Sequence, residues 1–281
     1  IVDIHPHIVA TDKIKYPPTP LFGIQSDWSK ERPANPEDLI AAMDEGGVGK
    51  TAIVHASTVY GFDNSLVADA VKRYPKRCTG VGSIDMLAPD AAKTAKMWLD
   101  RGMTGFRIFT GGSTKKVDAS ALDDPNSYPV WEVMSERGLS MCIQTDASGI
   151  PATIALAKRF PKVPVLVDHF ARPDVSGGAP YKNAAPLFSL AAVSSIYLKT
   201  TPVAMLALRK ANADIPGFMS KIVSEFGAGR VAWGSNWPNS PGTMKEILQE
   251  TKDAIAHLAQ KDQDMILGGT ALKIYPTLRD K

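Results

Sequence analysis

Eight short apolar runs, separated by helical sequence, are the feature that most constrains the fold. We expect the strands at residues 1–4, 51–55, 78–84, 104–109, 139–144, 163–168, 195–198 and 230–234. Continuous apolar runs are typical of strands buried on both faces, as in a parallel sheet covered by helices. The length of 281 residues suits a (β/α)8 TIM barrel, and we predict a single α/β domain over residues 1–281. An open doubly wound sheet is the alternative, but no GxGxxG motif follows the first run.

Helical sequence fills most of the intervals between these runs. The clearest helix begins after Asn35, which can cap it, has Pro36 at its first position, and ends at Gly46. Helical sequence is expected to fill roughly residues 204–226. Residues 8–35 show no clear period, and a connection of this length usually forms a lid or a substrate loop. We therefore expect this long loop over the mouth of the barrel.

The composition excludes several classes of partner. Hydrophobic residues make up 44% and charged residues 22%, an ordinary balance for a globular protein. A formal net charge of +3 is too small to indicate nucleic acid or a membrane surface as a partner. No apolar stretch reaches 18 residues, so no membrane span is expected. Cys78 and Cys142 lie in strand-like runs, and we expect reduced core thiols in a cytoplasmic protein.

Polar residues follow the expected strands, and in a barrel of this kind the chemistry lies at those ends. His5 and His7 are one residue apart, so an extended chain presents both imidazoles on the same side. Such a pair can bind a metal, polarise a carbonyl group or hold an anion. The other polar residues at these ends are His55, Asp85, Arg107, Gln144, His169, Lys199, Ser235 and Asn236. Four of the five histidines fall there, which indicates an active site.

Several of these residues also have a purely structural explanation. His55 could fill the upper layer of the barrel, Asp85 could cap the next helix, and Lys199 could be a solvated strand end. Arg107 stands in an apolar strand, where an unpaired guanidinium is costly. Its partner is either a structural carboxylate or an anionic substrate, and we favour the substrate.

Six short segments occur in order along the chain: DIHPH (3–7), VYGFDN (59–64), GFRIF (105–109), VDHFARPD (167–174), WGSNWP (233–238) and GGTALKIY (268–275). Through them the chain resembles the amidohydrolase superfamily, and within it the branch of 2-pyrone-4,6-dicarboxylate lactonases. The resemblance implies the distorted barrel of that superfamily. It also implies a metal-independent hydrolase of aromatic catabolism that opens a carboxylate-bearing lactone, such as a 2-pyrone dicarboxylate or a muconolactone-like compound.

The resemblance also implies roles for individual residues. The catalytic positions are His5, His7, His169 and 236, where the family has an aspartate that takes a proton from water. This chain has Asn236, and an amide is no general base at neutral pH. Either hydrolysis has been lost and the site only binds carboxylates, or the residue was changed to trap a ligand. We favour the second alternative and expect aspartate at this position to bring activity.

The substrate-binding residues are also assigned from the resemblance and from the expected loops. The arginines that grip substrate carboxylates look like Arg107 and Arg172. Further candidates for substrate contact are Tyr16, Trp28, His55, Tyr60, Asn64 and Gln144. Trp28 and Tyr16 could equally be packing residues of the long loop.

A cofactor is not expected to be required. Gln144 at the end of the fifth run is a poor metal ligand, which argues against the binuclear centre of some superfamily members. His5, His7 and His169 could hold one Zn²⁺, which is the alternative. A zinc-dependent decarboxylase of an aromatic or muconate-type acid is therefore the second enzymatic hypothesis. The expected partner is a small anionic lactone or carboxylate, not nucleic acid or a membrane, and a homo-oligomer is left open.

Overall fold

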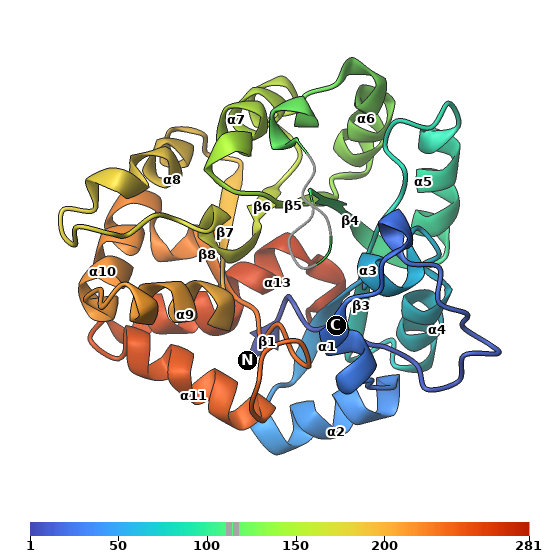
Figure 1. Cartoon of the computed structure of the whole chain (residues 1–281), viewed down its shortest axis with the longest axis horizontal. Coiled ribbons are helices and arrows are strands. Elements are labelled where there is room, and N and C mark those ends of the chain that lie inside the picture. Colours follow the sequence, from blue (N-terminus) through green and yellow to red (C-terminus); the bar gives the residue numbers. More distant parts are fainter. Residues whose placement is uncertain (111–113, 115–117, 281) are drawn as a thin grey trace.

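Eight parallel strands form a nearly closed barrel in the computed structural model of the chain, which describes residues 1–110, 114 and 118–280. They pair in chain order, and helices form a ring around them (Figure 1). The strands are β1 (Val2–Asp3), β2 (Lys50–Val54), β3 (Cys78–Gly82), β4 (Met103–Phe109), β5 (Ser140–Gln144), β6 (Val165–Val167), β7 (Ile196–Thr200) and β8 (Val231–Trp233). The Ile4 amide donates to the Trp233 carbonyl at 3.2 Å, which joins β1 to β8. The predicted (β/α)8 barrel is therefore confirmed.

The helices largely follow the intervals expected from the sequence. They include α2 (Pro36–Gly46), α4 (Ser65–Arg73), α5 (Ala91–Asp100), α6 (Tyr128–Arg137), α7 (Ile150–Arg159), α8 (Ala185–Ser189) and α11 (Met244–Ile255). Asn35 and Asp38 form a reciprocal capping box at the start of α2, as its sequence predicted. The helical sequence expected over roughly 204–226 forms two helices, α9 (Pro202–Lys210) and α10 (Ile215–Phe226). They are separated where Asn212 takes a left-handed backbone conformation with φ 50°.

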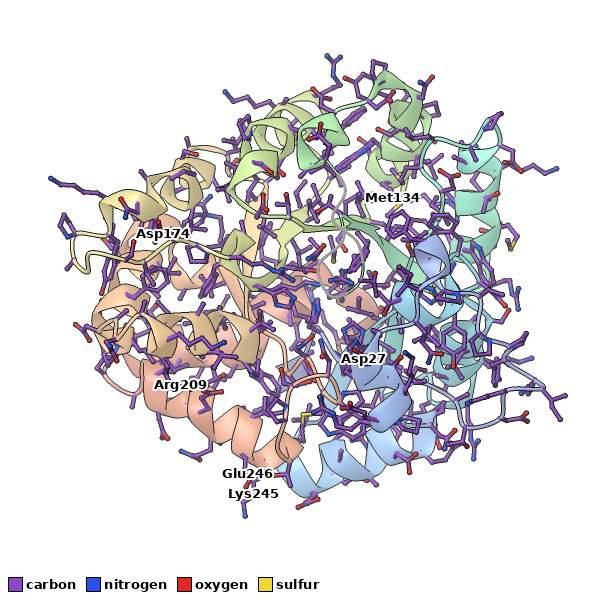
Figure 2. All side chains as sticks on the ribbon, viewed as in Figure 1. Asp27, Met134, Asp174, Arg209, Lys245 and Glu246 are labelled. Carbon is purple, nitrogen blue, oxygen red and sulfur yellow. The ribbon has the colours of Figure 1, made fainter. Side chains whose placement is uncertain are left out.

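Charged side chains lie on the outside of the helical ring. Lys245 and Glu246 in the first turn of α11 lie at the edge of the molecule in Figure 2. Arg209 belongs to α9. Arg209 forms an ion pair there with Glu250. Within the described part of the chain, no helix is both long enough and apolar enough to cross a bilayer.

The C-terminal segment closes the N-terminal end of the barrel. Helix α13 (Thr270–Ile274) and the following Tyr275 pack in one apolar cluster with inward-facing strand residues such as Val54. The Tyr275 hydroxyl lies 3.7 Å from the Cys142 sulfur. Cys142 and Cys78 are both buried and free, as predicted. Because apolar residues fill this end, polar side chains collect at the opposite end, where the strands finish.

Residues 8–35 are more ordered than their sequence indicated. They contain α1 (Asp27–Glu31) and a 3-10 turn at Leu21–Gly23, so the expectation of a purely irregular loop is wrong. Val9 and Ala34 form an antiparallel bridge that joins the two ends of the segment. Helix α1 brings Trp28 to the C-terminal end of the barrel, where its ring centroid lies 5.6 Å from that of His7.

Candidate active site

Seven of the residues selected from the sequence line one cavity of about 70 Å³ at the C-terminal ends of the strands. These seven are His7, Trp28, Arg107, Gln144, His169, Arg172 and Asn236. His5 is fully buried against two of them, with its ring centroid 5.1 Å from that of His7 and 4.9 Å from that of His169. The barrel therefore gathers residues from α1, β4, β5 and the segments after β1, β6 and β8 at one place.

His5 and His7 differ in which ring nitrogen carries the proton. His7 Nδ1 lies 2.7 Å from the Val54 carbonyl oxygen, which only accepts, so the neutral ring is protonated at Nδ1 and Nε2 is an acceptor. His5 Nδ1 lies 3.2 Å from Lys199 Nζ, which only donates as an ammonium. The proton of neutral His5 is therefore on Nε2. The two neighbouring rings offer the site one acceptor and one donor.

Both rings are neutral because they are buried. Burial, followed by the charge of Arg107, lowers the pKa of His7 to about 3. Burial, followed by the charge of Lys199, lowers the pKa of His5 well below its usual range. A third ring, His169, has its pKa lowered by burial to about 3, and its Nδ1 lies 2.7 Å from the Thr201 hydroxyl.

Asp168 and two cations form a buried charged cluster beside these rings. Asp168 Oδ2 accepts from Arg107 Nε at 2.8 Å, and Oδ1 lies 3.0 Å from Lys199 Nζ. Burial would raise the pKa of Asp168, but Lys199 and Arg107 together outweigh it and lower this pKa to about 2. Burial would likewise lower the pKa of Lys199, but Asp168 outweighs it and the pKa is raised. Two cations face one carboxylate, so the cluster favours an additional anion.

The cluster corrects two expectations and adds a residue that sequence reasoning missed. Arg107 has a structural carboxylate as the partner of its Nε, although the side chain also lines the cavity. Lys199 is fully buried and is not a solvated strand end. Asp168 was missed, although its place directly before His169 at the end of a strand was a usable signal. An arginine in an apolar strand already required such a carboxylate.

The segment after β6 holds His169 and Arg172 in a left-handed turn. Four consecutive residues, 169–172, have φ between 51° and 56°. Side chains make this conformation costly, by roughly 1–2 kcal/mol per residue. Strain of this kind is concentrated at functional sites, where surrounding structure maintains it. The turn places the buried His169 ring on the cavity and leaves Arg172 exposed at its mouth.

Asn236 follows β8 and also has a left-handed backbone, with φ 52°. Asparagine, aspartate and glycine tolerate this conformation best. The Asn236 amide nitrogen donates to the Ser240 hydroxyl at 2.9 Å, which orients the side chain along the cavity. Gly234 lies against β1, and a Cβ there would approach the His5 Cβ to 2.4 Å. The glycine therefore allows β8 to pack close to the histidine pair.

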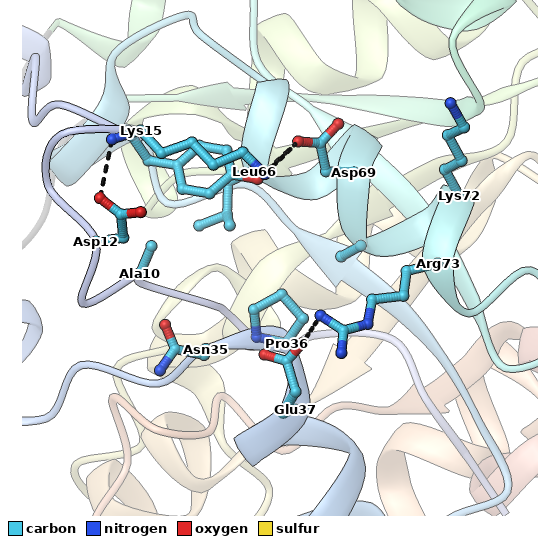
Figure 3. Close-up of a pocket in the computed structure, with 12 residues that line it drawn as sticks. Ala10, Asp12, Lys15, Asn35, Pro36, Glu37, Leu66, Asp69, Lys72 and Arg73 are labelled. Atoms are coloured by element: carbon cyan, nitrogen blue, oxygen red, sulfur yellow. Dashed lines mark hydrogen bonds and ion pairs between the residues drawn. The ribbon is translucent and has the colours of Figure 1, made fainter.

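Four residues that we expected to contact substrate do not line this cavity. Tyr16 lies at a second cavity of about 460 Å³ between the long loop, α2 and α4, where its hydroxyl donates to Asp69 at 2.6 Å. Figure 3 shows this cavity with Asp69 and Arg73 among the residues around it. Tyr60, His55 and Asn64 instead bond to backbone groups, namely the Ala10 amide, the Gly61 carbonyl, and the Ser83 amide and carbonyl. Their hydrogen bonds hold loops together behind the cavity wall.

Other expectations are corrected in detail. Asp85 accepts from the Leu87 amide in a turn and does not cap α5, whose N-cap is Asp90. The cavity lining also contains residues that had not been selected as site candidates, namely Ala56, Ser57, Thr58, Phe109, Val203 and Asn239.

The donor set is a poor fit for a metal ion. His5, Asp168 and His169 have ligand atoms within 4.8 Å of one another. Asp168, however, already forms ion pairs with two cations, Arg107 and Lys199, and a divalent ion beside them would be repelled. His5 Nδ1 accepts from Lys199, and its Nε2 carries the proton that a metal would have to replace. While Lys199 is charged, these residues are arranged for hydrogen bonding.

Comparison with known proteins identifies the class of protein that this barrel and site represent. A family model described as Amidohydrolase matches residues 2–277, so the chain belongs to the amidohydrolase family. An L-fucono-1,5-lactonase of Burkholderia ambifaria is 26% identical over 85% of this chain and 80% of its own. A 2-pyrone-4,6-dicarboxylate hydrolase of Comamonas testosteroni is 25% identical over 90% and 86%, which confirms the resemblance to that branch. An amidohydrolase structure from Burkholderia multivorans with bound zinc has TM-score 0.78 and 19% identity, with 98% of each chain covered.

Proposed function

We propose that this site opens a carboxylate-bearing lactone by attack of water on the ring carbonyl carbon. One observation carries the proposal: a histidine that donates and a histidine that accepts lie side by side, next to a cavity lined by two arginines. Lactone opening needs a donor for the oxygen that becomes negative and an acceptor for the attacking water. We assign these two functions to His5 Nε2, in the buried ring that packs against His7 and His169, and to His7 Nε2 in the cavity lining.

The two arginines support an anionic substrate. Arg107 is buried inside the cavity and Arg172 is exposed at its mouth. A ligand could therefore contact one guanidinium inside the cavity and one at its entrance. Guanidinium groups bind carboxylates through paired, charge-assisted hydrogen bonds. The excess positive charge of the buried cluster of Asp168, Arg107 and Lys199 also favours binding of an anion. Gln144 Oε1 is buried and has no hydrogen-bond partner within the described ranges, so it can accept from a water or a substrate hydroxyl.

Position 236 controls whether water is activated. The other acceptors at the site are weak bases, because His7 has a pKa of about 3 and Asp168 a pKa of about 2. Asn236 can hold a water through its side-chain oxygen but cannot take its proton. We propose that the Asn236 protein binds its lactone with slow turnover. An aspartate at this position would accept a proton from water as the new C–O bond forms and would return it to the ring oxygen as the ring C–O bond breaks. The products are a hydroxyl group and a carboxylic acid, which ionises and releases one proton.

We also propose that the reaction requires no metal ion. The supporting observation is the bond from Lys199 to His5, which supplies a hydrogen-bond donor where a Lewis acid would otherwise polarise the carbonyl. Treatment of the active form with a chelator should therefore leave its rate unchanged.

The experiment is a substrate screen with Asn236→Asp. The panel contains lactones with two, one or no carboxylates, and a pH-stat measures acid release while gas analysis of the headspace measures carbon dioxide. We expect acid release to be fastest with the dicarboxylates. Asn236→Gly is the matched control, because glycine keeps the left-handed backbone without the side chain. Carbon dioxide release would instead support the zinc-dependent decarboxylase, and no turnover of any lactone would support a binding protein.

A further inference from the structure

Lys199 is an unusual residue for the interior of a barrel. It lies in β7 and is fully buried, and its Nζ has two partners: Asp168 Oδ1 at 3.0 Å and His5 Nδ1 at 3.2 Å. Its side chain also contacts Cys142, which belongs to the apolar cluster formed with α13 and Tyr275. Lys199 does not line the cavity, so it acts on a ligand only through another residue.

We propose that Lys199 is a positioning residue that holds His5 in the tautomer protonated at Nε2. This inference rests on the proposed function for its chemical meaning, because a protonated Nε2 is what a developing oxyanion requires. His5 Nε2 is buried and has no hydrogen-bond partner in the part of the chain that the structure describes. The unpaired donor lies in a ring that packs against both cavity-lining histidines, His7 and His169.

A competing arrangement would place the His5 proton on Nδ1 and direct it to Asp168. The distance from His5 Nδ1 to Asp168 Oδ1 is 3.5 Å, longer than the 3.2 Å to Lys199 Nζ. The same carboxylate accepts a hydrogen bond from Arg107 at Oδ2 and forms an ion pair with Lys199 at Oδ1, so two cations already balance its charge. A hydrogen bond from Lys199 occupies the Nδ1 lone pair, so the geometry selects the Nε2 proton.

Removal of the ammonium should therefore reverse the tautomer. In Lys199→Met, Asp168 keeps Arg107 but loses its second donor, and His5 can then donate from Nδ1 to the free oxygen. His5 Nε2 then becomes an unprotonated acceptor next to two other imidazoles. The loss of Lys199 should convert a hydrogen-bond donor into a metal ligand.

The tautomer is measured directly by nitrogen NMR of protein labelled with ¹⁵N-histidine. In the unmodified protein, we expect the His5 signals of a neutral ring with the proton on Nε2, assigned by their loss in His5→Asn. In Lys199→Met, we expect the proton on Nδ1. Cys142→Ala is the matched control, because it changes the packing against Lys199 but leaves the ammonium in place. A His5 ring protonated at Nδ1 in the unmodified protein would overturn the proposal, even if Lys199→Met does not fold.

A zinc titration gives a second and independent readout. Partners that orient ligating histidines typically change metal affinity by about 10–100-fold, so we expect Lys199→Met to bind Zn²⁺ at least about tenfold more tightly than the unmodified protein. Equal affinity in the two proteins would contradict the proposal. Neither readout needs turnover. A failed lactone screen with a confirmed tautomer would thus refute only the proposed function, and the reverse result would refute only the role of Lys199.

Discussion

Asp168 Oδ2 and Arg107 Nε form a 2.8 Å hydrogen bond in which the arginine side chain is only 6% exposed and the aspartate is fully buried. Asp100 and Arg137 on the outer surface form an ion pair at the same distance, 2.8 Å, with exposed fractions of 64% and 40%. The two pairs have equal lengths and differ in their contact with water. They therefore allow the effect of burial on an ion pair to be measured within one protein.

The substitution Asp168→Asn should destabilise the fold strongly. It leaves the charges of Arg107 and Lys199 without their carboxylate in the barrel, and breaking a buried pair in this way costs about 3–5 kcal/mol. Asp100→Asn is the control and should cost less than about 1 kcal/mol, because its pair is exposed to solvent. Urea unfolding of both variants measures the difference. Equal losses for the two variants would show that the buried cluster has no special structural role.

The barrel could be predicted because the apolar runs in the sequence indicate strands that are buried on both faces. The strands are mainly apolar, as expected when both faces of the sheet are covered, and charged residues such as Arg107 and Lys199 are exceptions near their C-terminal ends. The position of strand ends then located His5, His7, His169 and Asn236, since a parallel barrel brings all strand ends together. The division of residues 204–226 was missed because it depends on one left-handed residue, Asn212, in an otherwise helical pattern.

The chemical states of the site could not be predicted in the same way. Whether His5 donates or accepts depends on Lys199, which is 194 residues away in sequence and for which a solvated strand end was one of two open alternatives. Tyr16 was expected near the substrate because its loop belongs to the mouth of the barrel, but its hydroxyl bonds to Asp69 on α4. Neither of these contacts can be predicted from the spacing of residues along the chain.

Stability should fall as the pH falls below 6.5. His7, His55 and His169 have folded-state pKa values of about 3, 4 and 3, against an ordinary value of 6.5, because they are buried. Below pH 6.5 the unfolded chain binds protons that the folded protein excludes, so their contribution to stability is full above this pH and is lost below it. Each such histidine lowers the free energy of unfolding by about 1.4 kcal/mol at pH 5.5.

Asp3 has the opposite effect on the pH dependence of stability over part of this pH range. Burial raises its pKa to about 6 from an ordinary 3.8, so the folded protein holds one proton more than the unfolded chain between these values. Because three histidines oppose this single aspartate, the free energy of unfolding still increases with pH over this range. His55→Gln, which lies outside the cavity lining, should reduce the slope of unfolding free energy against pH by one proton. An unchanged slope in chemical denaturation from pH 5 to 7 would contradict the burial of a neutral His55.

Arg172 should determine the affinity for carboxylates without requiring catalysis. Benzene-1,3-dicarboxylate is a suitable probe, because it has two carboxylates on a planar ring and no ester to hydrolyse. Loss of a charged hydrogen bond costs about 1.5–3 kcal/mol, so Arg172→Met should weaken binding by about 10–100-fold in calorimetry. The affinity of Arg172→Lys should lie between those of the unmodified protein and Arg172→Met, because lysine retains the charge without the paired hydrogen-bond geometry.

The control for this prediction is Arg209→Met on the outer surface of α9, which should leave the affinity unchanged. An uncharged lactone should bind equally to Arg172→Met and the unmodified protein. If the dicarboxylate also binds both equally, Arg172 is not a carboxylate ligand, and the anionic substrate class loses its main support.

The most direct test of the lactone-opening site is the rate of acid release by Asn236→Asp and the unmodified protein, both treated with a chelator. The substrate is the dicarboxylate lactone that performs best in the screen. General base catalysis contributes about 10²–10⁴-fold, so the aspartate variant should be faster by at least about 100-fold and its rate should not depend on added zinc. No increase in rate, or an increase that appears only when zinc is restored, would contradict water activation from position 236 without a metal.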